Sequence, residues 1–248
     1  MSPVLPPVAE KPRYVAEMFS RIAPRYDLMN TLMTAGQDAL WRRIVAHTAL
    51  NSEYAAPSTA VLDVGTGTGK LARVIQEERP GARVVGVDFT FGMLRAAPHG
   101  LHLAAADALR LPFSNGRFDA IVSAFVVRNL ADVTQGVAEQ VRVLRQGGRL
   151  VVLETTPGPH GVLRPLYRFF FRRVVPLMGR LIAGDGSAYT YLPESTLAFL
   201  EPARLADLLR QLGLVDVNIR PLALGCVAVT SGRKPGLLQS EAHTGDTL

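Results

Sequence analysis

Three glycines at alternating positions follow a short apolar stretch in Val61-Leu62-Asp63-Val64-Gly65-Thr66-Gly67-Thr68-Gly69. Glycines at such a turn let the backbone bend tightly and approach a ligand, because no Cβ stands in the way. Two acids, Asp88 and Asp107, end the next two predicted strands. Ligands of open parallel sheets bind at the carboxyl ends of the strands. These residues therefore predict a ligand site at that edge, with a glycine turn that serves only packing as the alternative.

The spacing of the glycines indicates which ligand class the turn would bind. A dinucleotide fingerprint needs G-x-G-x-x-G, but position 70 is Lys70 and the third glycine comes one residue early. The resulting G-x-G-x-G pattern resembles the S-adenosylmethionine loop of class I methyltransferases. A carboxylate such as Asp88 accepts hydrogen bonds from a ribose diol in both ligand classes, so this acid does not discriminate between them. For Asp107, a role in capping a turn is the alternative.

The elements that position these residues alternate between strands and helices. Apolar runs predict strands over 60–64, 84–88, 101–106, 118–125 and 149–153. Alternation at this spacing predicts an α/β fold with a doubly wound, Rossmann-like, mostly parallel sheet. Two further strands, over 215–220 and 226–230, predict an antiparallel hairpin at one edge. The helix that contains Val137 and Val141 should end at Gly147-Gly148.

The domain boundaries follow from the same patterns. We expect a flexible N-terminus over 1–12, one methyltransferase-like domain over 13–232 and a flexible tail over 233–248. The domain divides into an N-terminal helical cap (13–55), a cofactor-binding core (60–154), a lid over the substrate (155–200), and a helix with the hairpin (201–232). The cap should be helical in two pieces with an interruption at Pro24, and 55–58 should link it to the core.

The composition describes a globular chain. Of 248 residues, 48% are hydrophobic and 19% are charged, which excludes wholesale disorder. The net charge of +6 suits anionic partners but is too small to choose among them. The single cysteine, Cys226, excludes an intrachain disulfide and a cysteine-rich zinc site, and we expect no metal because the histidines lack ligand spacing. With no secretory leader and no long apolar run, we expect a cytoplasmic location.

Several short motifs, in a consistent order from about residue 14 to 234, are similar to those of the ubiquinone/menaquinone biosynthesis C-methyltransferase family. The glycine loop is shared by many methyltransferases, whereas the motifs that begin at Tyr26, Arg128 and Tyr189 are much more restrictive. The similar motifs are Tyr26-Asp27-Leu28-Met29-Asn30, Ala106-Asp107-Ala108, Leu111-Pro112-Phe113, Phe118-Asp119, Arg128-Asn129-Leu130, Gly147-Gly148-Arg149-Leu150 and Tyr189-Thr190-Tyr191-Leu192-Pro193-Glu194-Ser195. The chain departs from the family at Asp38, where a histidine is usual, at Thr66, often a glycine, and at Ala124, where the family has a serine that contacts the cofactor.

The resemblance implies S-adenosylmethionine as cofactor and a prenylated hydroquinone as substrate. The expected reaction is C-methylation of demethylmenaquinol to menaquinol. The ubiquinone-pathway benzoquinol, and a non-catalytic S-adenosylmethionine-binding scaffold of a quinone-synthesis complex, are the alternatives. The implied cofactor contacts are Asp63, Gly65, Gly67, Thr68, Gly69, Asp88, Asp107, Ala108 and Ala124, and the implied substrate contacts are Tyr26, Asn30, Asn129 and Tyr191. We expect no nucleic-acid partner, because Ser123-Ala124-Phe125-Val126 stands where an amino-methyltransferase would carry an N/D-P-P-Y tetrad.

Methylation of a ring carbon requires electron density on that carbon, which ionisation of the ring hydroxyl supplies. A phenolic hydroxyl has a pKa of about 10, so the site must favour its anion. Arg128 is the candidate that stabilises a developing phenolate, and a structural salt bridge is the alternative for it. Proton removal needs a base or a water chain, for which Asp27, Tyr26, Tyr189 and Asp185 are all eligible.

A basic segment over 163–182 lies within the predicted lid. It holds five arginines and no acid, and Arg164, Arg168 and Arg172 would share one helical face. Another face would carry Leu166, Phe169, Phe170 and Val174. This pattern is typical of a helix that lies in a membrane interface, so peripheral contact with an anionic membrane is one prediction. Packing of the apolar face on the sheet is the alternative, and the sequence leaves a homodimer open.

Overall fold

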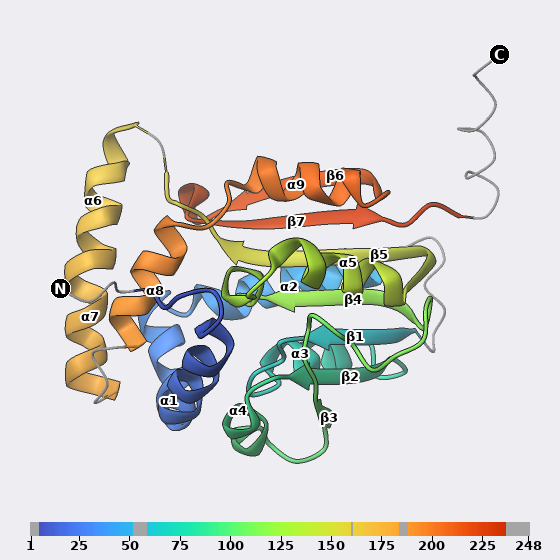
Figure 1. The fold of residues 1–248 in the computed structure, drawn as a ribbon, viewed down its shortest axis with the longest axis horizontal. Coiled ribbons are helices and arrows are strands. Elements are labelled where there is room, and N and C mark those ends of the chain that lie inside the picture. The colour runs from blue at the N-terminus through green and yellow to red at the C-terminus, as the bar shows by residue number, and fades with distance from the viewer. Residues whose placement is uncertain (1–4, 52–58, 160, 184–187, 237–248) are drawn as a thin grey trace.

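The computed structural model describes residues 5–51, 59–159, 161–183 and 188–236. For Leu163 and Ala183 it describes the backbone only. The predicted linker over 55–58, the base candidate Asp185 and tail residues 237–248 lie outside the described residues. Figure 1 shows a sheet with helices on both faces and a layer of helices across one end.

The described strands form one sheet in the order β3-β2-β1-β4-β5-β7-β6. β1 (Ala60–Val64) is fully buried and pairs in parallel with β2 (Arg83–Asp88) and β4 (Phe118–Ala124). β3 (His102–Ala105) adds to β2, and β5 (Leu144–Thr155) adds to β4, both in parallel. β7 (Val227–Arg233) runs antiparallel to β5 and to the edge strand β6 (Val215–Leu222). The doubly wound sheet with an antiparallel edge hairpin is therefore confirmed.

Helices cover the two faces because each presents an apolar stripe to the sheet. On one face, α2 (Gln37–Leu50) and α3 (Lys70–Glu78) contribute Trp41, Val45, Leu71 and Ile75 to a buried cluster. On the other, α5 (Val133–Val143) and α9 (Pro202–Gln211) contribute Val137, Leu205 and Leu209. The short α4 (Phe91–Ala96) packs against the N-terminal helix, and 3₁₀ turns occupy Val127–Asn129, Gly161–Leu163 and Ala223–Gly225.

The predicted interruption at Pro24 is wrong, since α1 (Lys11–Met33) continues through that proline. Pro24 removes one backbone hydrogen bond, at a cost of about 3 kcal/mol in a helix interior. Its neighbours Ile22, Ala23 and Met29 are buried on both sides of it, and their packing outweighs that cost.

The helix begins at Lys11, inside the segment predicted to be flexible. The Lys11 ammonium donates hydrogen bonds to the carbonyls of Arg128 and Leu130.

The predicted helix end at Gly147-Gly148 is also wrong. α5 ends at Val143, and Leu144 already begins β5 as a buried residue paired with Phe118. The two strands shift register between Phe118 and Ala120, and Gly147 has φ +74°. The glycines therefore provide an irregular stretch of strand, not a helix cap.

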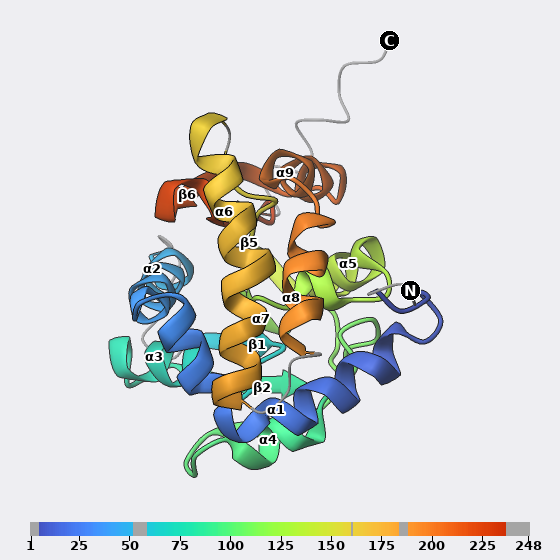
Figure 2. The same cartoon turned by 90° about the vertical axis from the view of Figure 1, so that its left-hand side faces the viewer.

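Residues 164–183 of the predicted lid form a nearly continuous helical rod at the carboxyl end of the parallel strands. It consists of α6 (Arg164–Phe169), a π-helical turn Phe170–Val174, α7 (Val175–Met178) and a second π turn Gly179–Ala183. α8 (Ala188–Leu197) lies beside it and α1 below it (Figure 2). The predicted apolar face divides, because Phe170 and Val174 are half-buried while Leu166 and Phe169 are exposed. Within the part of the chain that is described, no helix is both long enough and apolar enough to cross a membrane.

Candidate active site

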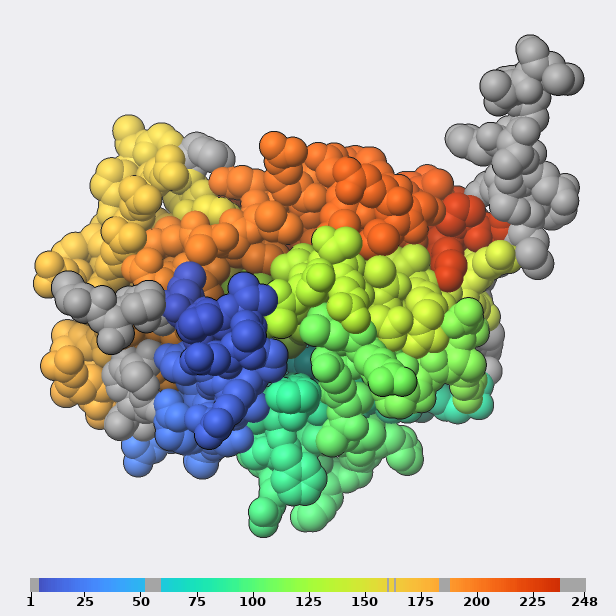
Figure 3. All heavy atoms as spheres, viewed as in Figure 1, coloured from blue at the N-terminus to red at the C-terminus, as the bar shows by residue number. Residues whose placement is uncertain are grey.

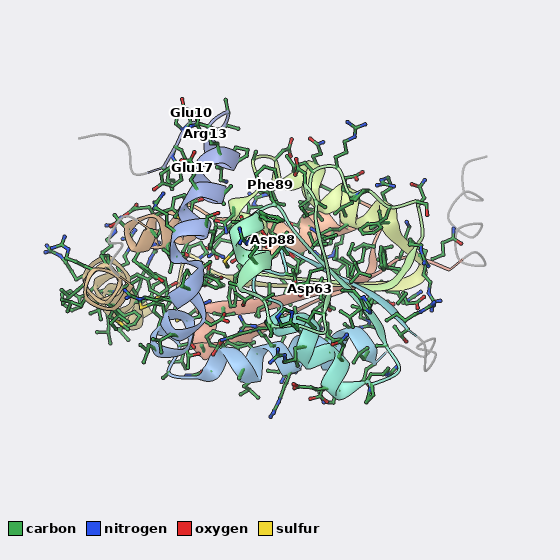
Figure 4. All side chains as sticks on the ribbon, turned by 90° about the horizontal axis from the view of Figure 1, so that it is seen from below. Glu10, Arg13, Glu17, Asp63, Asp88 and Phe89 are labelled. Atoms are coloured by element: carbon green, nitrogen blue, oxygen red, sulfur yellow. The ribbon has the colours of Figure 1, made fainter. Side chains whose placement is uncertain are left out.

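A cavity of about 120 Å³ lies where β1, β2, β3 and β4 end. Its wall holds six of the predicted cofactor contacts, namely Gly65, Gly67, Asp88, Asp107, Ala108 and Ala124. Sequence reasoning missed others, including Phe89, Thr90, Met93, Leu109 and Val126. In Figure 4, Asp88 and Phe89 lie near α1 and α4, while Asp63 lies farther from α1. Position directly after a strand end could have identified Phe89 and Thr90.

The glycine loop takes a backbone conformation that suits glycine. Gly65, Gly67 and Gly69 have φ values of +67°, +58° and +78°. The Gly67 amide donates to Asp88 Oδ2 at 2.8 Å, and the Thr90 amide donates to Asp88 Oδ1 at 2.7 Å. Burial raises the pKa of Asp88, while these two amide bonds act in the opposite direction. Asp88 therefore fixes the loop and also presents a carboxylate at the cavity wall.

Asp63, Thr68 and Gly69 are not among the described lining residues of this cavity. Asp63 is buried and accepts a hydrogen bond from Thr66 Oγ1 at 2.7 Å, and burial raises its pKa to about 6. Gly69 precedes the first residue of α3. Thr68 Oγ1 donates to both carboxylate oxygens of Asp27, each at 3.0 Å.

The Asp27 carboxylate therefore faces the glycine loop. Its second partner is Lys70, whose Nζ lies 3.5 Å from Asp27 Oδ1. Asp27 is absent from the described walls of both cavities, although its neighbour Tyr26 lines both. The structure thus makes Asp27 a link between the cap and the loop, and does not bring it to the substrate side.

The residues of this cavity fit S-adenosylmethionine. Asp88 offers a charged acceptor to ribose hydroxyls, and the glycines leave backbone free to approach a ligand. Apolar side chains of Met93, Ala108 and Leu109 offer a surface for a flat base. Asp107 Oδ1 accepts from the Leu109 amide at 2.9 Å, so this acid also caps its own turn, as the alternative interpretation held.

A second cavity, of about 310 Å³, lies between the cap, the lid and the sheet. In Figure 3, α1 (blue) fills the space between the lid (gold) and the core (green). The wall is mainly apolar and aromatic, with Met18, Ile22, Trp41, Tyr167, Phe170, Phe171 and Leu192 among its members. The predicted residues Asn30, Arg128, Tyr189 and Tyr191 also line it. Such a cavity suits an elongated apolar ligand with a polar head.

Three aromatic residues line both cavities. Phe19 and Tyr26 come from α1, and Phe125 directly follows β4. The two cavities therefore meet at a wall that these rings share. A group that passes from a ligand in the first cavity to one in the second would pass between them.

Arg128 lies in the wall of the second cavity and is also ion-paired, so both interpretations of it hold. Its residue exposure is 7%, and Nη1 donates to Glu154 Oε1 at 2.5 Å and to the Phe125 carbonyl at 2.9 Å. Its buried Nε meets no acceptor among the described residues. Burial by itself would lower the pKa of Arg128, but the Glu154 carboxylate raises it above its usual value. Sequence reasoning missed Glu154, which is 3% exposed at the end of β5.

Tyr26 and Tyr191 stay protonated at neutral pH. Burial raises the pKa of Tyr26, and it raises the pKa of Tyr191 to about 12. Tyr191 Oη donates to Asn129 Oδ1 at 3.3 Å, which joins α8 to the turn after β4. Asn129 itself lines the first cavity. These phenols are therefore hydrogen-bond donors, not bases.

Comparison with known proteins identifies relatives along nearly the whole chain. Residues 8–234 match the ubiE/COQ5 methyltransferase family. A demethylmenaquinone methyltransferase of Deinococcus radiodurans is 44% identical over 239 residues, which cover 92% of this chain and 97% of that protein. One of Thermus thermophilus is 46% identical over 225 residues, covering 88% of this chain and 100% of that protein.

Solved structures with low sequence identity share the fold. An S-adenosylmethionine-dependent methyltransferase of Thermotoga maritima, a possible histamine N-methyltransferase, has a TM-score of 0.60 at 18% identity and covers 88% of this chain and 98% of that one. A phosphoethanolamine N-methyltransferase of Haemonchus contortus, solved with S-adenosylhomocysteine, has a TM-score of 0.59 at 14% identity and covers 88% of this chain and 60% of that one. The chain thus has the class I S-adenosylmethionine-dependent methyltransferase fold, with its sheet order and glycine loop, and it belongs to the ubiE/COQ5 methyltransferase family.

Proposed function

We propose that this protein transfers a methyl group from S-adenosylmethionine to a ring carbon of demethylmenaquinol, which gives menaquinol. The observation that carries the proposal is the large aromatic cavity that shares a wall with the cofactor cavity and holds Arg128. Relatives named as demethylmenaquinone methyltransferases, at 44% and 46% identity, support the choice of substrate. The ubiquinone-pathway benzoquinol is the second candidate, because a relative of Desulfotalea psychrophila is named for both pathways at 42% identity.

The residues of the second cavity would orient the quinol and favour its anion. S-adenosylmethionine supplies an electrophilic methyl group when bound. The Arg128 guanidinium would stabilise charge that develops on the ring oxygen, and its pairing with Glu154 holds it in place before reaction. Protonated Tyr26 would donate a hydrogen bond to a ring oxygen, and Tyr191 would do so when its hydroxyl exchanges Asn129 Oδ1 for the ligand. The apolar lid residues would receive the prenyl chain and exclude water.

Proton removal falls to a group at the cavity wall. Asp38, which departs from the family pattern, is the one carboxylate among the described lining residues of this cavity. It is buried and paired with Arg42 Nη1 at 2.5 Å. We propose Asp38 in place of Asp27 as the carboxylate candidate, and Tyr189 as a residue that shapes the wall.

A direct assay tests the function. Purified protein with S-adenosylmethionine should convert a short-chain demethylmenaquinol to menaquinol, with equimolar S-adenosylhomocysteine, as measured by mass spectrometry. The demethylated benzoquinol, run in parallel, should react at least tenfold more slowly. Faster reaction of the benzoquinol would move the protein to the other pathway. Binding of S-adenosylmethionine without methylation of either quinol would favour the scaffold alternative.

We also propose that the lid contacts an anionic membrane, from which the prenylated substrate enters. Large apolar side chains are exposed along the outer surface of the lid rod, among them Leu166 (66%), Phe169 (61%) and Leu181 (74%). Arg164, Arg168, Arg172, Arg173 and Arg180 are exposed on the same rod. Exposed apolar groups beside arginines favour a membrane interface, where each arginine contributes about 1 kcal/mol near an anionic surface. Figure 2 looks onto this surface.

Cosedimentation with vesicles tests this contact. We expect binding to phosphatidylglycerol-containing vesicles that weakens with salt and falls at least tenfold in Arg168→Glu/Arg173→Glu, because two attractions become repulsions. The matched control is Arg83→Glu/Arg117→Glu, which makes the same charge change at exposed arginines at the start of β2 and just before β4, and it should lose much less binding. Equal loss in both variants would point to net charge alone and would contradict a specific lid contact.

A further inference from the structure

The three rings that separate the cavities are held in defined positions. Phe19 and Tyr26 lie seven residues apart on α1, which places them on one helix face, and their centroids are 5.7 Å apart in an edge-to-face arrangement. Phe125 has its centroid 6.4 Å from that of Trp41, also edge to face. Each ring thus has an aromatic neighbour that fixes its orientation.

The backbone at Phe125 is strained. Its φ of +60° lies in the left-handed region, where a bulky residue is a true outlier. The amide donates to the Leu153 carbonyl at 2.8 Å, and the carbonyl accepts from Arg128 Nη1 at 2.9 Å and from Asn129 Nδ2 at 3.2 Å. Strain of this kind persists only where the surroundings hold it, and it clusters at functional sites. The turn thus directs the Phe125 ring to the shared wall at a cost to stability.

The charge at this wall differs before and after methyl transfer. The transferred methyl must lie where the two cavities meet, and the sulfonium that carries it is positive. Aromatic faces attract cations, and the attraction strengthens when water is excluded. The product sulfide is neutral and loses that attraction.

We propose that Phe19, Tyr26 and Phe125 form an aromatic cage that recognises the sulfonium charge. The cage favours S-adenosylmethionine over S-adenosylhomocysteine and so promotes release of the product. The cage depends on the cofactor and not on which quinol is methylated. A test of the cage is therefore independent of the proposed substrate.

Calorimetric binding of both ligands to the full chain tests the cage. Phe125→Leu should raise the dissociation constant of S-adenosylmethionine about three- to thirtyfold, whereas that of S-adenosylhomocysteine should change less than about twofold. Phe19→Leu should show the same selective loss, and it replaces the Phe125 variant if that variant folds poorly, because Phe19 has ordinary helical backbone angles. Tyr26→Phe keeps the ring and should preserve the ratio of the two dissociation constants.

The matched control is Phe89→Leu, because Phe89 is in the described wall of the cofactor cavity but not in that of the second cavity. This change should raise the dissociation constants of both ligands by the same factor. Equal weakening of both ligands in Phe125→Leu and Phe19→Leu, or no weakening in either variant, would overturn the cage.

Discussion

Replacing Arg128 with alanine is expected to lower turnover at least a hundredfold and the free energy of unfolding by about 3–5 kcal/mol. Turnover falls because the phenolate loses the cation that stabilises it as charge develops. Stability falls because Glu154 would be left buried without its 2.5 Å partner. The affinity for S-adenosylmethionine should fall by about tenfold at most, because Arg128 lies in the wall of the second cavity and reaches the first only through its hydrogen bond to the Phe125 carbonyl. Steady-state kinetics, calorimetry and denaturant unfolding measure the three effects.

A double variant separates the two roles of Arg128. Arg128→Met/Glu154→Gln removes both charges at similar volume, so most of the lost stability should return. Turnover should stay near the level of Arg128→Ala, because no cation faces the ring oxygen. Recovery of turnover along with stability would show that Arg128 acts only through the fold.

Asp88→Ala is expected to raise the dissociation constant of S-adenosylmethionine ten- to a hundredfold. Hydrogen bonds to charged groups contribute about 1.5–3 kcal/mol, and the carboxylate is the acceptor for the ribose hydroxyls. The change also removes the acceptor of the Gly67 and Thr90 amides, which loosens the glycine loop. Calorimetry on the purified protein measures this dissociation constant directly.

Asp107→Ala is the comparison for this result. Asp107 lines the same cavity beside Ala108 and Leu109, whose apolar side chains offer a surface for the base and not for the ribose, and its Oδ1 accepts the Leu109 amide. We expect a loss of at most tenfold, in the range of a neutral hydrogen bond. A larger loss at Asp107 than at Asp88 would mean that the ribose acceptor has been assigned to the wrong acid.

The sequence by itself determined the sheet and the cofactor end of the site. Apolar runs of strand length, separated by helical periodicity, specify a parallel sheet, and the G-x-G-x-G turn specifies where its ligand binds. Such features are local, because strand, turn and helix signals lie within about ten residues of one another. For that reason the positions of Asp88 and the glycine turn at the ligand edge of the sheet can be predicted from sequence alone.

Only the tertiary structure decided which side chains face each other across the site. Arg128 meets Glu154 from 26 residues away, and Asp27 meets Thr68 from 41 residues away. A motif places a residue at a strand end or on a helix, but packing of distant elements sets the direction of its side chain. The same packing carries α1 through Pro24 and brings Phe19 and Phe125 to one wall. Contacts between distant segments form only when burial of the whole core offsets the entropy of bringing them together, so they cannot be derived from local sequence spacing.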